Sequence, residues 1–269
     1  MNPDAPLGVF DSGLGGLTVV RALRAALPNE SIVYLGDTAR VPYGTRSAET
    51  VVRYALSCAS LLRARRAKAI IVACNTVSAV ALDMLRAEFD MPVLGVIEPG
   101  ARAAVEAAHG RTIGILGTAG TIASGAYPRA VAAVSTRVAV VSQAAPLLVP
   151  LVEEGWLDGE VPHLVARKYL EPVIHSGARV ILLGCTHYPL LEHVLQQEAD
   201  ELAGEHVTIV DSARTTAGTV SAFLEARGLR HDQESPNLHI MVTDRPRSFE
   251  AVASRFLGQQ LGEIEQVDL

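Results

Sequence analysis

Short apolar runs rich in β-branched residues alternate along the chain with longer segments rich in alanine, leucine and arginine. Runs that are apolar on both faces are typical of central strands in a parallel sheet that helices cover on both sides. This alternation predicts right-handed βαβ units and therefore a doubly wound α/β fold with mainly parallel sheets. The strands are expected at Leu7–Phe10, Ile32–Leu35, Ala69–Ala73, Val93–Val96, Thr112–Leu116, Val138–Val141, Val180–Leu183, Val207–Val210 and His239–Val242.

The residues that follow these runs are small and polar. Ligands of open parallel sheets bind at the carboxyl ends of the strands, so these exits are the first place to look for a site. Hydroxyl groups beside the free amides of helix N-termini favour a small anion. The exits are Asp11-Ser12-Gly13, Gly36-Asp37-Thr38, Cys74-Asn75-Thr76, Glu98-Pro99, Gly117-Thr118, Cys185-Thr186-His187 and Asp211-Ser212.

A weak internal repeat relates the two halves of the chain. AKAIIVACNT (67–76) aligns with ARVILLGCTH (178–187), which places Cys74 opposite Cys185. GVFDSGLGG (8–16) aligns loosely with GILGTAGT (114–121) at a similar spacing, which places Ser12 opposite Thr118. The repeat predicts two pseudo-symmetric α/β lobes with the site in the cleft between them. We expect residues 1–97 plus 208–269 in the first lobe and residues 98–207 in the second.

Two cysteines at equivalent positions of facing lobes would approach one bound molecule from opposite sides. Inversion at a stereocentre needs a base on one face of the carbon and an acid on the other, and a thiolate and a thiol can serve as that pair. Asn75, Thr76 and Thr186 could hold a carboxylate and stabilise charge that develops on it. Asp11 and His187 could tune the two sulfur atoms differently.

Other chemistries fit parts of the same pattern. Cys185 with His187 could form the nucleophile and base of a hydrolase, although Cys74 would then be dispensable. Each cysteine alone could be packing at a strand end, as we expect for Cys58 in its helical segment. DSGLGG (11–16) could be a tight turn or a ligand contact. Glu153 is most simply part of a solvated helix end.

Neither a metal nor pyridoxal phosphate is expected. Cys185 and His187 have a spacing that zinc could use, but no second Cys-x-x-Cys or His-x-x-x-His pair accompanies them. A pyridoxal enzyme needs a Schiff-base lysine. The two lysines are Lys68, which precedes its strand, and Lys168, which lies in a predicted helix.

Composition excludes several classes of protein. The chain of 269 residues is 49% hydrophobic and 19% charged, which is typical of a globular protein. Its net charge of −6 and lack of a basic block disfavour nucleic-acid binding. Three cysteines and no evident signal peptide predict a cytoplasmic protein, and no apolar run approaches the roughly 20 residues that cross a membrane.

The motifs together closely resemble the glutamate racemases of the aspartate/glutamate racemase superfamily. The resemblance extends over nearly the whole chain, and its specificity lies in the set and order of motifs. They are FDSGLGGLTV (10–19), YLGDTARVPYG (34–44), ACNTVS (73–78), GVIEPG (95–100), GTAGT (117–121), VEEGW (152–156), LGCTHYPLL (183–191) and VDSA (210–213).

This resemblance implies a racemisation of glutamate by two bases without a cofactor. The catalytic residues it implies are Cys74 and Cys185, with Asp11 on the Cys74 side and His187 and Glu153 on the Cys185 side. The substrate contacts it implies are Asp11, Ser12, Pro42, Tyr43, Gly44, Asn75, Thr76, Thr118, Thr121, Thr186 and His187.

The resemblance also implies a role and a setting. The product D-glutamate would supply peptidoglycan synthesis, and so the bacterial cell wall and cell shape. Relatives are commonly homodimers, and their lobes are expected to close on the substrate and exclude water. The alternatives are a sister racemase that acts on aspartate or hydantoins and a two-lobed amino-acid-binding protein.

Overall fold

The apolar runs form two parallel sheets in a computed structural model that describes residues 2–231, 236–245 and 249–269. The first sheet has the strand order β10-β9-β2-β1-β3-β4 and the second has the order β6-β5-β7-β8. Every strand pairing is parallel, so the predicted doubly wound α/β fold in two lobes is confirmed. The strands are β1 (Leu7–Asp11), β2 (Ile32–Gly36), β3 (Ala69–Val72), β4 (Val93–Gly95), β5 (Thr112–Gly117), β6 (Val140–Ala144), β7 (Ala178–Gly184), β8 (Thr208–Asp211), β9 (Leu238–Val242) and β10 (Ile264–Gln266).

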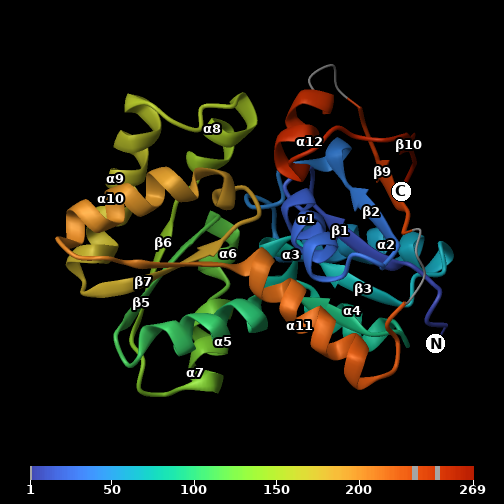
Figure 1. The fold of residues 1–269 in the computed structure, drawn as a ribbon, viewed down its shortest axis with the longest axis horizontal. Helices are drawn as coiled ribbons and strands as arrows, with labels where there is room; N and C mark the ends of the chain where they lie inside the picture. Colours follow the sequence, from blue (N-terminus) through green and yellow to red (C-terminus); the bar gives the residue numbers. More distant parts are fainter. Residues whose placement is uncertain (1, 232–235, 246–248) are drawn as a thin grey trace.

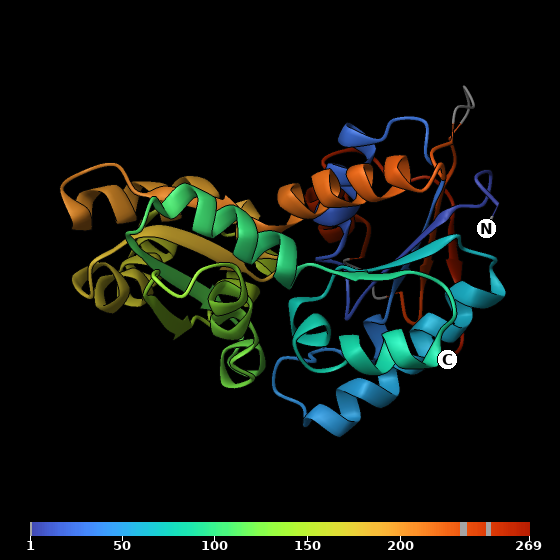
Figure 2. The ribbon, with the colours of Figure 1, turned by 90° about the horizontal axis from the view of Figure 1, so that it is seen from below.

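Helices cover both faces of each sheet. Figures 1 and 2 show the two lobes side by side, with both termini in the first lobe. The first lobe contains α1 (Leu17–Ala26), α2 (Ala48–Ala64), α3 (Asn75–Val80), α4 (Leu82–Glu88), α11 (Ser212–Ala226), α12 (Phe249–Leu257) and the 3-10 helix η1 (Thr38–Arg40). The second contains α5 (Ile97–Ala108), α6 (Ala119–Ala123), α7 (Ala126–Val134), α8 (Leu148–Glu154), α9 (Glu160–His175), α10 (Glu192–Ala203) and the 3-10 helix η2 (Tyr188–Leu191).

Alternate residues of each strand enter different cores. Val9 of β1 packs in a cluster that includes α1, α11 and α12, whereas Phe10 packs in a cluster that includes α2 and α4. The cluster around Val9 continues into α8, α9 and α10 of the second lobe. The two lobes therefore share one continuous apolar contact.

The strand orders reveal the internal repeat. In the first sheet β2-β1-β3-β4 are neighbours, and in the second β6-β5-β7-β8 follow in the same relative order. Thus β1 corresponds to β5 and β3 to β7, as the sequence alignment predicts. Cys74 and Cys185 follow the corresponding strands β3 and β7.

Two features differ from the sequence predictions. The expected lobe boundary at residue 208 lies too early, because β8 pairs with β7 in the second sheet, as β4 pairs with β3 in the first. The chain returns to the first lobe only after Asp211, through α11, which packs on both α1 and α5. Strand β10 was not expected, since its three residues include two polar ones and pair only at the sheet edge.

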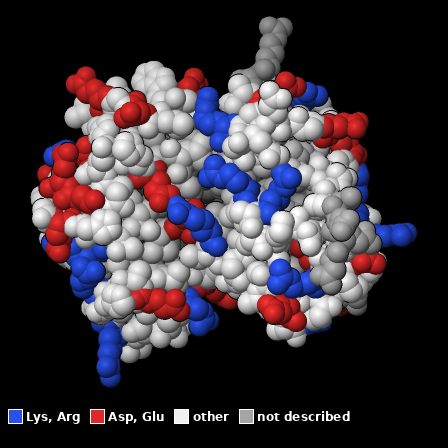
Figure 3. Space-filling model, viewed as in Figure 1, with Lys and Arg blue, Asp and Glu red and all other residues white. Residues whose placement is uncertain are grey.

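The surface carries charges of both signs. On the face in Figure 3, acidic side chains spread over the left edge, and several basic side chains lie near the middle without forming a continuous basic surface. Among the described residues, no helix has both the length and the apolar character needed to cross a membrane.

Candidate active site

The two predicted cysteines lie where the lobes meet. Cys74 is the N-cap residue of α3 at the end of β3, and Cys185 directly follows β7. Their exposed fractions are 5% and 6%, so both thiols are almost fully shielded from solvent. Cys185 is among the groups that raise the pKa of Cys74, so the two thiols lie near each other.

The neighbours of Cys74 come from the exit of β1. Its thiol donates a hydrogen bond to the Ser12 hydroxyl at 3.5 Å. Burial, followed by the charge of Asp11, raises the pKa of Cys74 to about 12. Cys74 is therefore a neutral thiol at rest at neutral pH.

Asp11 is itself almost completely buried. Its Oδ2 accepts hydrogen bonds from the amides of Gly13 and Gly16, both at 3.1 Å, while its Oδ1 is buried without a partner. Burial raises the pKa of the carboxyl, although His187 and the backbone amides act in the opposite direction. The free oxygen is available to a donor that enters the site.

The neighbours of Cys185 form a chain of polar groups. His187 Nδ1 lies 3.9 Å from the Cys185 sulfur, and Nε2 lies 3.2 Å from Glu153 Oε1. Burial alone would lower the pKa of His187, but the hydrogen bonds to Cys185 and Glu153 outweigh it and raise the pKa to about 10. At neutral pH both ring nitrogens therefore carry protons, one directed at the sulfur and one at the carboxylate.

Polar residues from both lobes meet around the cysteines. The hydroxyls of Thr76, Thr118 and Thr121 lie 3.0–3.2 Å from one another, and Gly120 donates its amide to the Gly44 carbonyl at 2.9 Å. These contacts join the first lobe to the second through residues that the sequence singled out.

Asn75 also connects the lobes. Its Oδ1 accepts a hydrogen bond from Tyr127 of α7 at 2.6 Å, while its Nδ2 is buried without a partner. An unpaired buried donor costs free energy unless a ligand or water satisfies it. Asn75 Nδ2 is therefore a candidate donor to an anionic ligand.

Pro42 and Tyr43, two of the predicted substrate contacts, differ in their burial. Pro42 is exposed, and Tyr43 is buried with its hydroxyl bonded to Asp37. Asp37 also accepts from Arg40 and Thr243, at 2.6 and 2.9 Å. Because its hydroxyl is occupied, Tyr43 would reach a ligand through its main chain.

Tyr127 and Thr18 were not expected from the sequence. Tyr127 fixes Asn75, and the Thr18 hydroxyl donates to the Thr186 carbonyl at 3.1 Å. Both lie inside helices, whereas the sequence-based search for a site considered only the residues that follow each strand.

Within residues 2–231, 236–245 and 249–269, no group of three or more His, Cys, Asp or Glu side chains is arranged to hold a metal ion. Lys68 forms a buried ion pair with Glu30, at 2.6 Å, before the start of β3. Cys58 is fully buried in the core of the first lobe, as predicted.

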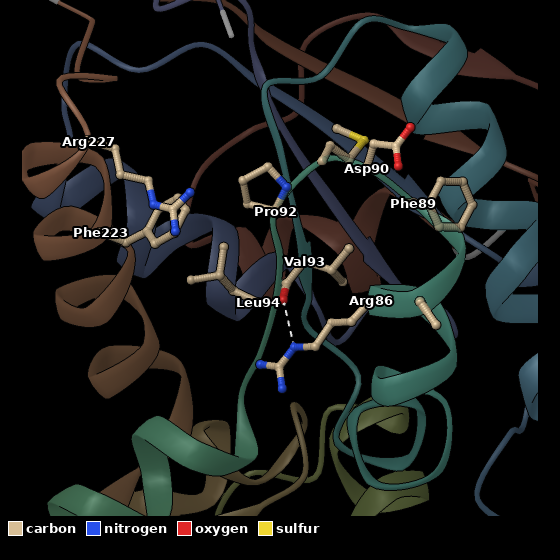
Figure 4. A pocket seen from close by; sticks show the side chains of 10 residues that line it. Arg86, Phe89, Asp90, Pro92, Val93, Leu94, Phe223 and Arg227 are labelled. Carbon is tan, nitrogen blue, oxygen red and sulfur yellow. Dashed lines mark hydrogen bonds between the residues drawn. The ribbon is translucent and has the colours of Figure 1, made fainter.

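A hollow of about 580 Å³ lies away from the cysteines, at the amino-terminal end of β4 (Figure 4). Arg86 and Pro92 line one part of it and Phe223 and Arg227 of the α11 end line another. Arg86 is bonded to the carbonyl of Val93 at 3.1 Å. The hollow contains none of the predicted catalytic residues.

Comparison with known proteins gives consistent results. The family model of Asp/Glu/Hydantoin racemase matches residues 17–220. A glutamate racemase of Geobacter metallireducens is 50% identical over 268 residues, covering 99% of this chain and 98% of that protein.

Solved structures agree over the same length. The Francisella tularensis glutamate racemase in complex with D-glutamate has a TM-score of 0.91 and 34% identity, covering 99% of this chain and 98% of that one. The Thermus thermophilus glutamate racemase in complex with β-chloro-D-alanine has a TM-score of 0.90 and 44% identity, covering 100% and 99%.

The paired lobes and these similarities define an isomerase of the racemase class. Within that class, the chain belongs to the Asp/Glu/hydantoin racemase family.

Proposed function

We propose that this protein interconverts L- and D-glutamate with Cys74 and Cys185 as its two acid–base groups and without a cofactor. The observation that carries the proposal is the pair of shielded thiols at corresponding strand ends of two facing lobes. A hydrolase would need only Cys185 and His187, and a binding protein would need neither thiol.

The proton balance of the reaction is simple. A thiolate on one face removes the α-proton, and the opposite thiol gives its proton to the other face of the same carbon. The first group ends as a thiol and the second as a thiolate, so the reverse reaction exchanges their roles. Hydrogen-bond donors at the substrate carboxylate stabilise the negative charge that develops on it.

The unpaired groups of the site support this binding mode. Asn75 Nδ2 is a free donor for the carboxylate, and the hydroxyls of Thr76, Thr118 and Thr121 supply further donors. The free Oδ1 of Asp11 suits the substrate ammonium or a proton on the Cys74 side. His187, held by Glu153, would serve the Cys185 side.

Relatives favour glutamate over shorter amino acids. Those at 43–50% identity are named glutamate racemases, and the Francisella tularensis protein was solved with D-glutamate. One methylene changes binding in a pocket by only about 1–3 kcal/mol, so activity on aspartate is the measurement that separates the substrates.

We also infer the setting of the reaction. D-Glutamate made by this protein would supply peptidoglycan synthesis for the cell wall and cell shape, in the cytoplasm where its cysteines stay reduced. The working form would be a homodimer, which sedimentation equilibrium would test against a monomer mass of 28.5 kDa.

The test of the mechanism uses L-glutamate in D2O with the wild type, Cys74→Ala and Cys185→Ala. We expect the wild type to deuterate the α-carbon and lose optical rotation, and either variant to lose racemisation by at least about 10³-fold. Cys58→Ala is the matched control, since it removes a buried thiol that is not one of the two proposed acid–base groups and should racemise normally. Full activity in Cys74→Ala would contradict the two-base mechanism, and aspartate turnover at the glutamate rate would contradict the substrate.

A further inference from the structure

Helix α12 belongs to the first lobe but reaches the second. Its buried face, which includes Phe249 and Ala253, packs in the first lobe, where the helix contacts α1. Its last turn carries Arg255 and Phe256, which contact residues of the second lobe. Figure 1 shows α12 beside α8 at the top of the molecule.

Phe256 packs directly against the imidazole of His187. The two ring centroids are 4.9 Å apart and their planes are inclined by 78°, an edge-to-face arrangement. Phe256 is fully buried, so the phenyl ring has little freedom to move. The contact restricts the rotation that would turn Nδ1 away from Cys185 and Nε2 away from Glu153.

Arg255 holds the main chain that carries Glu153. Its Nη1 donates to the carbonyls of Val152 and Glu153, at 2.8 and 2.9 Å. These belong to the last turn of α8, where the negative end of the helix dipole makes a cation favourable. Gly155, in the left-handed conformation at φ +80°, leaves room for the guanidinium, since a Cβ there would lie 2.6 Å from Nη2 of Arg255.

Glu153 needs such an anchor. Its side chain is 52% exposed, so burial does not fix the carboxylate. Apart from its bond to His187, the described contacts that fix this residue are those of its main chain, including the one from Arg255.

We propose that α12 is a positioning element, in which Arg255 and Phe256 hold the His187–Glu153 pair in register with Cys185. The proposal rests on the function proposed above, because it assigns these residues to the Cys185 side of that reaction. It also makes the pair dependent on contact between the lobes, since α12 comes from the first lobe and the pair from the second.

The test measures the titration of His187 directly. In protein labelled with ¹⁵N-histidine, His187→Asn identifies the His187 signals, and Glu153→Gln shows the effect of losing the carboxylate. The charged groups around the imidazole are Cys185, Glu153, Asp11 and, from α12, Arg255. Phe256→Leu leaves all four charged groups unchanged. Arg255→Met removes one of them, the guanidinium that is bonded to the main chain of Glu153.

We expect both variants to lower the pKa of His187 by about one unit, in the same direction as Glu153→Gln. The alkaline limb of the pH profile of kcat/KM should move to lower pH by the same amount. At a pH above the wild-type limb we expect about a tenfold loss, mainly in kcat because the substrate contacts remain, whereas near pH 8 His187 stays largely protonated and the loss is small. Arg255→Lys should recover part of the effect, since an ammonium can also donate to these carbonyls but lacks the planar guanidinium that orients Nη1.

Arg179→Met is the matched control. Arg179 also donates to main-chain carbonyls, those of Ile174 and Ala178, but at the amino-terminal end of β7. It should leave the His187 titration and the pH profile unchanged.

Each outcome decides the proposal. Folded Arg255→Met or Phe256→Leu protein with a wild-type His187 titration overturns it, as does a Glu153→Gln protein whose titration is unchanged. Arg255→Met keeps the test valid if Phe256→Leu fails to fold, because Arg255 is only partly buried. If the wild type does not racemise glutamate, the proposed function fails, but the titration still shows whether α12 positions the pair.

Discussion

At the scale of single residues, the two thiols differ in their neighbours and not in their depth. Cys74 faces Ser12 and the carboxylate of Asp11, which disfavours a thiolate. Cys185 instead faces the imidazole of His187, whose pKa is raised, at 3.9 Å. The two sides of the site are therefore chemically unequal, which suits a chiral substrate whose two faces are also unequal.

Replacing Asp11 with asparagine should raise the stability of the protein and lower its activity. The pKa of Asp11 is raised by burial, so its charged form costs stability, and this cost grows as pH rises from about 4 to above the raised value. The variant can keep the bonds from Gly13 and Gly16 through its amide oxygen. We expect Asp11→Asn to unfold at a higher temperature than the wild type at pH 7, yet to lose at least about 10²-fold in kcat/KM.

Thermal unfolding at pH 4 and pH 7, with racemisation assays, checks this prediction. The gain in melting temperature should be larger at pH 7. A variant that is both less stable and fully active would show that the carboxylate serves structure alone.

At the scale of secondary-structure elements, the loop between β1 and α1 brings the lobes into contact. A Cβ on Gly15 would lie 2.3 Å from the Thr186 hydroxyl and 2.7 Å from Nδ1 of His187. Neither neighbour can move freely, because the Thr186 carbonyl accepts from Thr18 and His187 is bonded to Glu153. The close approach requires a glycine at this position. A left-handed backbone conformation is not the reason, because the φ of Gly15 is outside that region.

Gly15→Ala should therefore push the two strand exits apart. We expect a loss of at least about 10²-fold in kcat/KM and a destabilisation of about 1–3 kcal/mol, as for other overpacked sites. Gly218→Ala is the control, because Gly218 is exposed in α11 with no atom near its Cβ position. It should stabilise the protein by about 0.5–1 kcal/mol with unchanged kinetics. Urea unfolding and racemisation assays measure both, and wild-type kinetics in Gly15→Ala would contradict the close approach.

At the scale of the whole molecule, the proposed site and a buried ion pair lie at opposite ends of the strands of the first sheet. The proposed site is at the carboxyl ends of the strands, and the Lys68–Glu30 pair lies at their amino ends. Lys68 also donates to the carbonyls of Pro3 and Leu229, and Glu30 accepts from the amide of His231. This cluster joins four separate parts of the chain, at Pro3, Glu30, Lys68 and Leu229–His231.

Lys68→Met should lower the free energy of unfolding by about 3–5 kcal/mol, because it leaves a buried carboxylate without its partner. The double variant with Glu30→Gln should recover part of that loss. Glu225→Gln, which removes an exposed ion pair with Arg230, should cost less than about 1 kcal/mol. Urea unfolding measures all three, and kcat/KM per folded molecule should stay at the wild-type value; a loss of activity in folded Lys68→Met would contradict this separation.

Nine of the ten strands in the described residues, their parallel arrangement and the correspondence of Cys74 with Cys185 follow from the sequence alone. These follow from local rules: apolar periodicity defines buried strands, and a parallel sheet brings the strand exits to one edge. The repeated strand ends then predict a site with one cysteine on each side of the bound molecule.

The contacts among the side chains around those thiols come from the tertiary structure. It pairs Glu153, which the residues alone suggested was a solvated helix end and the resemblance placed on the Cys185 side, with His187, and it brings Tyr127 to Asn75. It moved the lobe boundary past β8 and set α12 against the Cys185 side. These contacts join residues far apart in the chain, and their geometry depends on how two lobes pack together, which no local pattern of residues encodes.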